Sequence, residues 1–276
     1  TLQDISCVGR CSITVALPVI SAMGVECGIL PTAVLSTHTM FKTFTCKDLS
    51  DQIGPIADAW KQENITFDAV YTGYLASAEQ CSQVCSFFDR FYDGNNLILV
   101  DPAMADNGSL YPAFDESFPA EMAKVCAKAD IILPNITEAC LLTGTPYKTS
   151  YDESYIHELL KKLLALGCHT AALTGVSYEK GRLGVVSLDR NGDTFSYFTR
   201  HCPQSYHGTG DLYSSTVLGG LMRGLSLGNA LSLAADFVVA CIEATASAEN
   251  ARWYAVEFES QIPLLCEMLD QRLKNN

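Results

Sequence analysis

The residues with the clearest chemical potential stand in one stretch, Gly208-Thr209-Gly210-Asp211, which leads into an apolar run with helical character. A helix N-terminus has backbone N–H groups without intrahelical partners and partial positive charge, so it suits an anion. The two glycines allow close approach of a ligand because they lack a Cβ. Asp211 would repel a phosphate unless it takes a proton from an attacking hydroxyl. The stretch indicates phosphoryl transfer, with a plain helix cap and turn as the alternative.

Further polar side chains follow predicted buried strands. Asp101 ends the strand at 97–102, and Asp106 lies in the loop that follows. In an open parallel sheet the carboxyl ends of the strands form the ligand crevice, so both acids are candidates for chemistry. Asn135 and Glu138 have capping-box spacing at the start of a helix, but an amide and a carboxylate there also suit a hydrated divalent ion. The two interpretations are compatible.

Strands and helices alternate along most of the chain, as apolar runs ending at glycine or proline alternate with segments of helical period. This pattern predicts an α/β protein, a three-layer α/β/α sandwich with a mostly parallel central sheet, and one domain over residues 1–276. The predicted strands are 5–9, 24–31 continuing into 33–35, 69–74, 97–102, 131–134 and 170–175, with a hairpin of 183–188 and 194–199. The predicted helices are 13–23, 48–64, 76–91, 117–128, one opening at 135, 151–166, 212–223, 227–247 and 254–273.

Composition narrows the function classes. With 31 acidic against 18 basic residues the formal charge is −13, which disfavours nucleic acid and anionic membranes as partners and makes Mg²⁺ an early expectation for a phosphate site. The 12 cysteines include no Cys-x-x-Cys pair, so we expect reduced thiols in a cytoplasmic protein. The apolar stretches are judged too short or too interrupted to cross a bilayer. Neither a dinucleotide G-x-G-x-x-G nor a P-loop motif is present.

Several segments together carry a family resemblance. They are Ser12, Ser36-Thr37-His38-Thr39, Thr72-Gly73-Tyr74, Asp101-Pro102 with Asp106 and Tyr111, Pro134-Asn135 with Glu138, Thr174-Gly175, and Gly208-Thr209-Gly210-Asp211. On these residues the chain resembles the ribokinase-like superfamily over essentially its whole length, and within it the pyridoxal (vitamin B6) kinases. The Ser-Thr-His-Thr and Thr-Gly-Tyr segments point to vitamin kinases in preference to sugar kinases.

The resemblance implies ATP-dependent phosphorylation of the 5'-hydroxymethyl group of pyridoxal, pyridoxamine or pyridoxine. By matching position, Asp211 is the base, and the backbone of Gly208, Thr209 and Gly210 is the anion hole for the transferred phosphoryl group. This assignment agrees with the physical requirement of phosphoryl transfer for positioning and charge neutralisation.

The resemblance also implies the binding residues. Ser12, Thr39 and Tyr74 line the pyridine-ring pocket, the tyrosine by stacking. Asp106, Asn135 and Thr174 lie near the ATP phosphates. The acids Asp101, Asp106 and Glu138 organise Mg²⁺ and a monovalent cation such as K⁺. Relatives are commonly homodimers, so a homodimer is expected.

The chain departs from the family pattern at a few positions. Met40 stands where many relatives have glycine, and Tyr206-His207 precede the glycine stretch where apolar residues are more usual. We interpret His207 as a loop residue. The basic residue that contacts the γ-phosphate is unassigned, with Arg10, Lys42 and Lys180 as candidates.

Two other functions remain open. The first is the same reaction on hydroxymethylpyrimidine, the thiamin precursor, or on a sugar or nucleoside; hydroxymethylpyrimidine kinases often carry cysteine at the position of Asp211, and sugar kinases often show an early glycine pair. The second is a non-catalytic protein that binds a B6 vitamer or a nucleotide, which would be expected to have lost the base.

Overall fold

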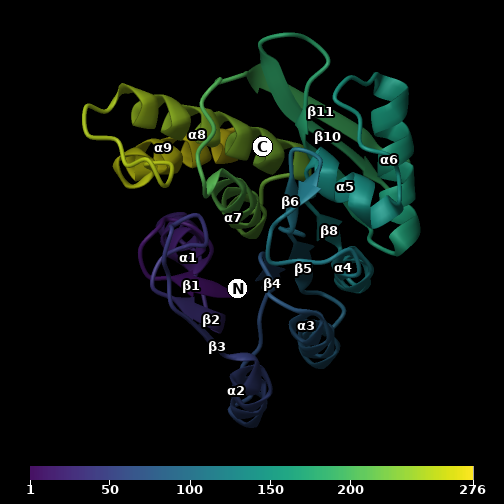
Figure 1. Cartoon of the computed structure of the whole chain (residues 1–276), viewed down its shortest axis with the longest axis vertical. Coiled ribbons are helices and arrows are strands. Elements are labelled where there is room, and N and C mark those ends of the chain that lie inside the picture. Colours follow the sequence, from purple (N-terminus) through teal and green to yellow (C-terminus); the bar gives the residue numbers. More distant parts are fainter. Residues whose placement is uncertain (276) are drawn as a thin grey trace.

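The computed structural model describes residues 1–275, whose elements are shown in Figure 1. The strands are β1 (Leu2–Ser6), β2 (Leu30–Leu35), β3 (Cys46–Asp48), β4 (Ala69–Thr72), β5 (Leu97–Val100), β6 (Ala105–Asp106), β7 (Ser109–Leu110), β8 (Ile131–Ile132), β9 (Thr170–Val176), β10 (Arg182–Asp189) and β11 (Thr194–Arg200). The helices are α1 (Ile13–Ala22), α2 (Ser50–Gln62), α3 (Ala78–Phe91), α4 (Phe118–Cys126), α5 (Ile136–Thr143), α6 (Glu153–Leu166), α7 (Thr209–Met222), α8 (Leu227–Ser247), the 3₁₀ turn η1 (Glu259–Gln261) and α9 (Ile262–Lys274).

Nine strands form the central sheet, in the order β11-β10-β9-β8-β5-β4-β1-β2-β3. The six strands from β9 to β2 pair in parallel, whereas β10 and β11 at one edge and β3 at the other pair antiparallel. A separate short hairpin consists of β6 and β7. The predicted mostly parallel sheet is therefore confirmed, and the carboxyl ends of its parallel strands lie along the same edge of the sheet.

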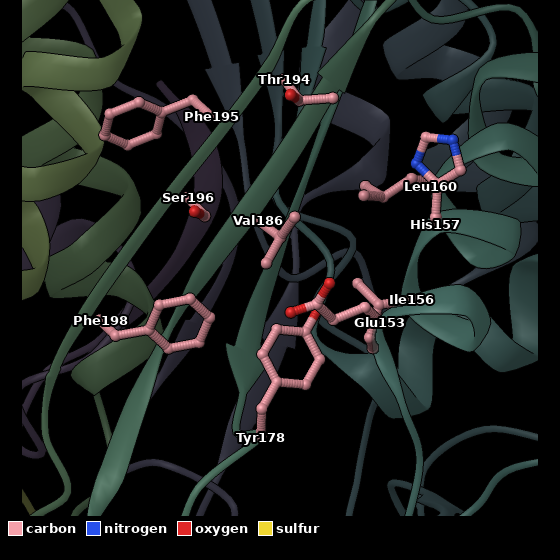
Figure 2. Close-up of a pocket in the computed structure, with 10 residues that line it drawn as sticks. All are labelled: Glu153, Ile156, His157, Leu160, Tyr178, Val186, Thr194, Phe195, Ser196 and Phe198. Carbon is pink, nitrogen blue, oxygen red and sulfur yellow. The ribbon is translucent and has the colours of Figure 1, made fainter.

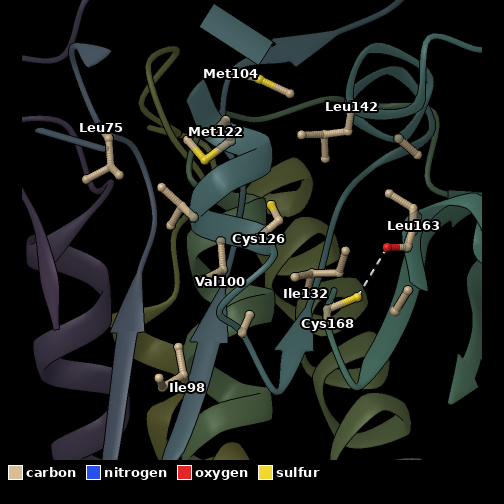
Figure 3. Packing of buried hydrophobic residues seen from close by; sticks show 14 of the residues in the cluster. Leu75, Ile98, Val100, Met104, Met122, Cys126, Ile132, Leu142, Leu163 and Cys168 are labelled. Carbon is tan, nitrogen blue, oxygen red and sulfur yellow. Dashed lines mark hydrogen bonds between the residues drawn. The ribbon is translucent and has the colours of Figure 1, made fainter. Parts of the chain in front are cut away.

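Helices cover both faces of the sheet, because successive strand residues point to opposite sides. On β5, Ile98 and Val100 belong to the hydrophobic cluster under α2 to α6, while Leu99 belongs to the cluster under α1, α7, α8 and α9. Figure 3 shows part of the first cluster, in which Met122 of α4 packs over Val100 and Ile132. The three-layer sandwich predicted from the sequence is confirmed.

The helix α8 contradicts the expectation that every apolar stretch is too short or too interrupted to cross a bilayer. Its 21 residues are long and apolar enough, by length and composition, to cross a membrane. Within the fold it packs against α7 and β11, and Leu231, Leu233 and Phe237 are buried there. These contacts are those of a core helix.

Several predicted boundaries are wrong. The strand predicted at 5–9 is β1 at Leu2–Ser6, and residues 7–9 are not in a strand. Residues 24–29 are not a strand, and β2 begins only at Leu30. The last helix begins at Ile262, because residues 254–258 run without helical structure and Val256 donates its backbone N–H to the His207 carbonyl. The helix α7 begins at Thr209 instead of 212. Its earlier start makes most of the glycine stretch the first turn of a helix.

Candidate active site

The N-terminus of α7 is the centre of the site. Gly208 is the N-cap residue with φ 85°, a left-handed conformation that favours glycine. A Cβ built on Gly208 would lie 2.1 Å from the Arg10 carbonyl oxygen, so this residue must also be small. Thr209, Gly210 and Asp211 form the first helical turn, whose N–H groups have no preceding helical carbonyl to bond. This backbone can therefore receive an anion.

Asp211 is half-buried on the same turn, and its carboxylate accepts a hydrogen bond from the Ser12 backbone N–H. Burial, with the nearby charges of Asp101 and Asp4, raises the pKa of Asp211 to about 7. A base works best when its pKa is close to the working pH. Asp211 therefore has the place and the basicity to take a proton from an alcohol.

Asp101 is attached to the same helix by a bond that spans 113 residues of sequence. The Ser214 hydroxyl donates to Asp101 Oδ2 at 2.7 Å in a buried environment, and the Asp101 backbone N–H donates to the Thr72 carbonyl. Burial raises the pKa of Asp101 to about 6. Sequence reasoning did not single out Ser214; because α7 begins at Thr209, Ser214 lies three residues after Asp211 on the same helix face.

Glu138 serves as a cap and also faces Asp101. Its carboxylate accepts from the Asn135 backbone N–H at 2.8 Å, and its own N–H donates to the Asn135 side chain at 3.0 Å, so the capping box is confirmed. The other Glu138 oxygen accepts from the Met104 N–H at 3.1 Å. Burial and the charge of Asp101 raise the pKa of Glu138 well above its usual range. The cap interpretation is therefore confirmed, and the cation interpretation stays a prediction.

The arrangement of the acids limits how Mg²⁺ could bind. Asp106 is exposed and accepts hydrogen bonds from its neighbour Asn107, and within residues 1–275 no three acidic, histidine or cysteine side chains form a metal-binding group. Mg²⁺ in kinases is commonly held by one or two carboxylates together with substrate phosphates. The buried pair Asp101 and Glu138 fits that kind of site and does not fit an all-protein cage.

Two further predicted phosphate-side residues lie beside this pair. Asn135 uses its amide nitrogen to hold the Ala105 carbonyl at 2.8 Å, which attaches the β6–β7 hairpin to α5. Thr174 pairs with Asn135 in an isolated parallel bridge, and both its N–H and its hydroxyl donate to the Pro134 carbonyl. Asn135 and Thr174 therefore shape the strand ends next to Glu138.

A third buried acid, Asp4, also lies near Asp211. Asp4, in β1, accepts from the Ser12 hydroxyl at 2.6 Å and from the Ser6 hydroxyl at 3.0 Å. Ser12 has φ 52° and ψ −130°, an unusual conformation for a residue other than glycine. Burial raises the pKa of Asp4, and the two serine donors oppose that effect. Sequence reasoning missed Asp4, which lies before the strand predicted at 5–9 and inside β1 as observed.

His38 connects the segments around Asp4. Its Nδ1 accepts from the Met40 N–H at 3.2 Å, so its Nε2 carries the proton and donates to the Tyr254 carbonyl at 2.8 Å. The His38 and His207 ring centroids are 4.3 Å apart. His207 is therefore a structural contact between the glycine stretch and the loop after β2. Burial lowers the pKa of His38. Burial also lowers the pKa of His207, to about 4.

The other predicted ring-pocket residues lie near this group. Tyr74 is half-buried with its ring 5.4 Å from that of Phe114, and burial followed by the charge of Asp4 raises its pKa to about 12. Thr39 and Met40 are exposed. The tyrosine is thus placed close to Asp4, while Thr39 stands on the outer part of the loop.

Among the candidate phosphate-binding cations, Arg10 is in contact with the glycine stretch through its carbonyl. Its Nε donates to Glu259 at 2.8 Å, and its buried Nη1 has no hydrogen-bond partner within residues 1–275. Lys42 and Lys180 are both exposed. Of the three, Arg10 is the residue whose backbone contacts the glycine stretch, and its phosphate-binding role stays a prediction.

A cavity of about 340 Å³ lies away from these residues, between α6 and the β10–β11 hairpin. Figure 2 shows its lining, which includes His157, Tyr178 and Phe198 and none of the predicted site residues. The site is therefore defined by the strand ends and the α7 terminus.

A carboxylate with a raised pKa on the first turn of α7, free amides beside it, and the buried acids Asp101 after β5 and Glu138 in α5 are consistent with a kinase of the ribokinase-like class. Comparison with known proteins agrees. The phosphomethylpyrimidine kinase family model matches residues 14–254. The chain belongs to that family.

Three relatives show the range of the family. A candidate phosphomethylpyrimidine kinase from Bacteroides thetaiotaomicron, solved with pyridoxal, is 36% identical with a TM-score of 0.91, over 96% of this chain and 93% of that one. Pyridoxal kinase from Lactobacillus plantarum is 31% identical with a TM-score of 0.89, over 98% and 96%. Hydroxymethylpyrimidine/phosphomethylpyrimidine kinase from Bacillus subtilis is 28% identical, over 89% of this chain and 82% of that protein.

Proposed function

We propose that this kinase transfers the γ-phosphoryl group of ATP to the 5'-hydroxymethyl group of a B6 vitamer. The observation that carries the proposal is Asp211, a carboxylate with a raised pKa on the first turn of α7, next to backbone amides that can receive the phosphoryl charge. The relatives at 31% and 36% identity, a pyridoxal kinase and a protein solved with pyridoxal, favour a B6 vitamer as acceptor.

In the proposed reaction, the vitamer hydroxyl gives its proton to Asp211 while its oxygen attacks the γ-phosphorus. The bond between the γ-phosphorus and the bridging oxygen of ATP breaks, and ADP leaves with that oxygen. The amides of Gly208, Thr209 and Gly210 stabilise the negative charge on the transferred group. Electrostatic stabilisation and proton removal are thus supplied by one helical turn.

Asp101 and Glu138 would hold the Mg²⁺ that accompanies ATP, and the ion would neutralise phosphate charge. Arg10 is the proposed phosphate-side cation, because its backbone packs against Gly208 and its Nη1 has no hydrogen-bond partner within residues 1–275. On the ring side, Ser12 and Tyr74 are the proposed pocket residues, with Thr39 at the pocket edge. A dependence on K⁺, a homodimer and a cytoplasmic location also belong to the proposal.

A second candidate acceptor is hydroxymethylpyrimidine, which is favoured by the family match and by the relative from Bacillus subtilis. Asp211 argues against it, since kinases of this pyrimidine often have cysteine at the matching position.

The test is a coupled ADP-release assay with Mg-ATP and five acceptors: pyridoxal, pyridoxamine, pyridoxine, hydroxymethylpyrimidine and ribose, each with and without K⁺. We expect turnover with the B6 vitamers. Turnover with hydroxymethylpyrimidine alone would show that the acceptor is a pyrimidine, and it would leave the proposed mechanism of phosphoryl transfer unchanged. A folded protein that binds ATP and is silent with all five would contradict the proposed function.

A further inference from the structure

Asp4 is a buried acid that the proposed reaction leaves unused. It is 5% exposed, and no lysine or arginine within residues 1–275 forms an ion pair with it. The nearby His38 is neutral, since one ring nitrogen accepts a hydrogen bond and the other donates one. Buried charges in proteins are normally paired, so a carboxylate without a counter-ion at a binding site suits a positively charged ligand.

Asp4 also fixes what Ser12 can offer to a ligand. A carboxylate has no hydrogen to donate, so the single hydroxyl hydrogen of Ser12 must point to Asp4 Oδ1 at 2.6 Å. The Ser12 backbone N–H is already bonded to Asp211. Toward a ligand the Ser12 hydroxyl therefore presents only lone pairs. It is a hydrogen-bond acceptor, strengthened by the negative charge behind it.

We propose that Asp4 is a specificity-determining residue, which makes Ser12 an obligatory acceptor and selects a substrate ring whose nitrogen is protonated. This inference rests on the proposed function, because it takes Ser12 to line the ring pocket. Asp4 acts on the substrate through Ser12 and through its charge. It plays no part in the transfer of the phosphoryl group.

The inference distinguishes the two candidate acceptors. The ring nitrogen of a 3-hydroxypyridine such as pyridoxine readily carries a proton near neutral pH, since the neighbouring phenol can give up its own. Ring nitrogens of an aminopyrimidine are weaker bases and present lone pairs. A lone pair facing the Ser12 acceptor has no hydrogen to share, and a site with an unpaired polar group rejects such a ligand strongly.

The first test uses the unaltered protein and pyridoxine labelled with ¹⁵N in the ring, without ATP. The ¹⁵N chemical shift of a pyridine nitrogen differs widely between its protonated and unprotonated forms. We expect the bound nitrogen to stay protonated at a pH where free pyridoxine has lost that proton. A bound nitrogen without a proton would overturn the role of Asp4.

The second test compares Asp4→Asn with Ser6→Ala. The amide that Asp4→Asn introduces can donate to Ser12 and turn its hydroxyl hydrogen toward the ring, so we expect an unprotonated bound nitrogen and a KM for pyridoxal raised about tenfold. The KM for ATP and kcat should change less than about twofold. Ser6→Ala removes the other Asp4 donor and leaves the Ser12 bond, so it should resemble the unaltered protein. Circular dichroism checks the folding of both variants.

The outcomes separate this inference from the proposed function. Turnover of pyridoxal with an unprotonated bound ring, or an Asp4→Asn variant with unchanged KM and unchanged ¹⁵N shift, would overturn the role of Asp4 alone. A protein that neither binds nor phosphorylates pyridoxine and pyridoxal would overturn both. A third outcome is that Asp4→Asn loses turnover of pyridoxamine but keeps turnover of pyridoxal. This would show that Asp4 recognises the side-chain ammonium of pyridoxamine, and it would overturn selection for a protonated ring nitrogen.

Discussion

The two ends of the site are built in different ways. The proposed phosphoryl end consists of Gly208 to Asp211 at the N-terminus of α7, with Asp101 directly after β5 and Glu138 in the first turn of α5. The proposed ring end is formed by Asp4 in β1, Ser12 before α1, His38 after β2 and Tyr74 after β4. One end depends mainly on backbone amides of a continuous segment. The other depends on hydrogen bonds between side chains of separate segments.

Because of this difference, the two ends should tolerate change differently. A helix N-terminus provides its amides and dipole to any anion, so the phosphoryl end can serve many alcohol substrates. The ring end has an unusual backbone conformation at Ser12, and its donors and acceptors are assigned by specific partners. We therefore expect changes at the phosphoryl end to lower kcat, and changes at the ring end to raise the KM for the acceptor.

Replacing the base should have the largest effect. Asp211→Asn is expected to lower kcat about 10³-fold, because the amide takes no proton, while the KM for ATP changes little. The coupled ADP-release assay measures it. Asp89→Asn is the control, since Asp89 is exposed on α3 and pairs with Lys128. Near-normal turnover of Asp211→Asn would show that another group is the base.

Gly208→Ala should lower kcat about 10²-fold, because a Cβ 2.1 Å from the Arg10 carbonyl and a φ of 85° together displace the anion hole. Gly54→Ala is a matched control in α2, where a Cβ meets nothing within 4 Å. That control should keep full activity and gain about 0.5–1 kcal/mol of unfolding free energy. If Gly208→Ala kept its kcat and raised only the acceptor KM, the division between the two ends would be wrong.

The pH dependence tests the state of the base directly. Because Asp211 must be ionised to act and its pKa is raised to about 7, kcat/KM should fall about tenfold per unit as pH decreases below 7. Above pH 7 this group should impose no further change. Initial rates between pH 5 and 9 would give the profile. A profile flat down to about pH 5 would contradict a raised pKa in the free enzyme.

At the ring end, Gly9→Ala should raise the KM for pyridoxal about tenfold with kcat within about twofold. Gly9 has φ 151°, and a Cβ there would lie 2.4 Å from His38 Cδ2, so the histidine must move. Initial rates against pyridoxal and against ATP separate the two constants. A loss confined to kcat would place Gly9 with the phosphoryl end.

The smallest expected effect is on stability. The pKa of Asp211 is raised from 3.8, so the folded state holds its proton more tightly than the unfolded chain does. The contribution of Asp211 to the free energy of unfolding therefore decreases as the pH rises from 4 to 7, and it stays low above pH 7. Asp211→Asn removes that cost. At pH 8 the variant should unfold about 2–4 °C higher, equal to about 1 kcal/mol, and at pH 4 the two proteins should melt together. Calorimetry that found the variant less stable at pH 8 would contradict the raised pKa.

Much of the fold could be predicted from local patterns. The alternation of apolar strands and amphipathic helices indicated the layers, and the capping box at Asn135 and Glu138 indicated the start of α5. Boundaries failed where tertiary contacts compete with propensity. Residues 254–258 have a helical pattern, yet Val256 is held by the His207 carbonyl and Phe258 is buried without helical structure.

By itself, the sequence determined the phosphoryl end, because its glycines, threonine and acid are contiguous and a helix terminus has the same amides wherever it lies. Only the tertiary structure decided the ring end and the partners of the acids. Asp101 meets Ser214 across 113 residues, His38 meets Tyr254 across 216, and Asp4 meets Ser12 through a strained turn. Such contacts depend on strand order and helix packing, and these leave no local pattern in the chain.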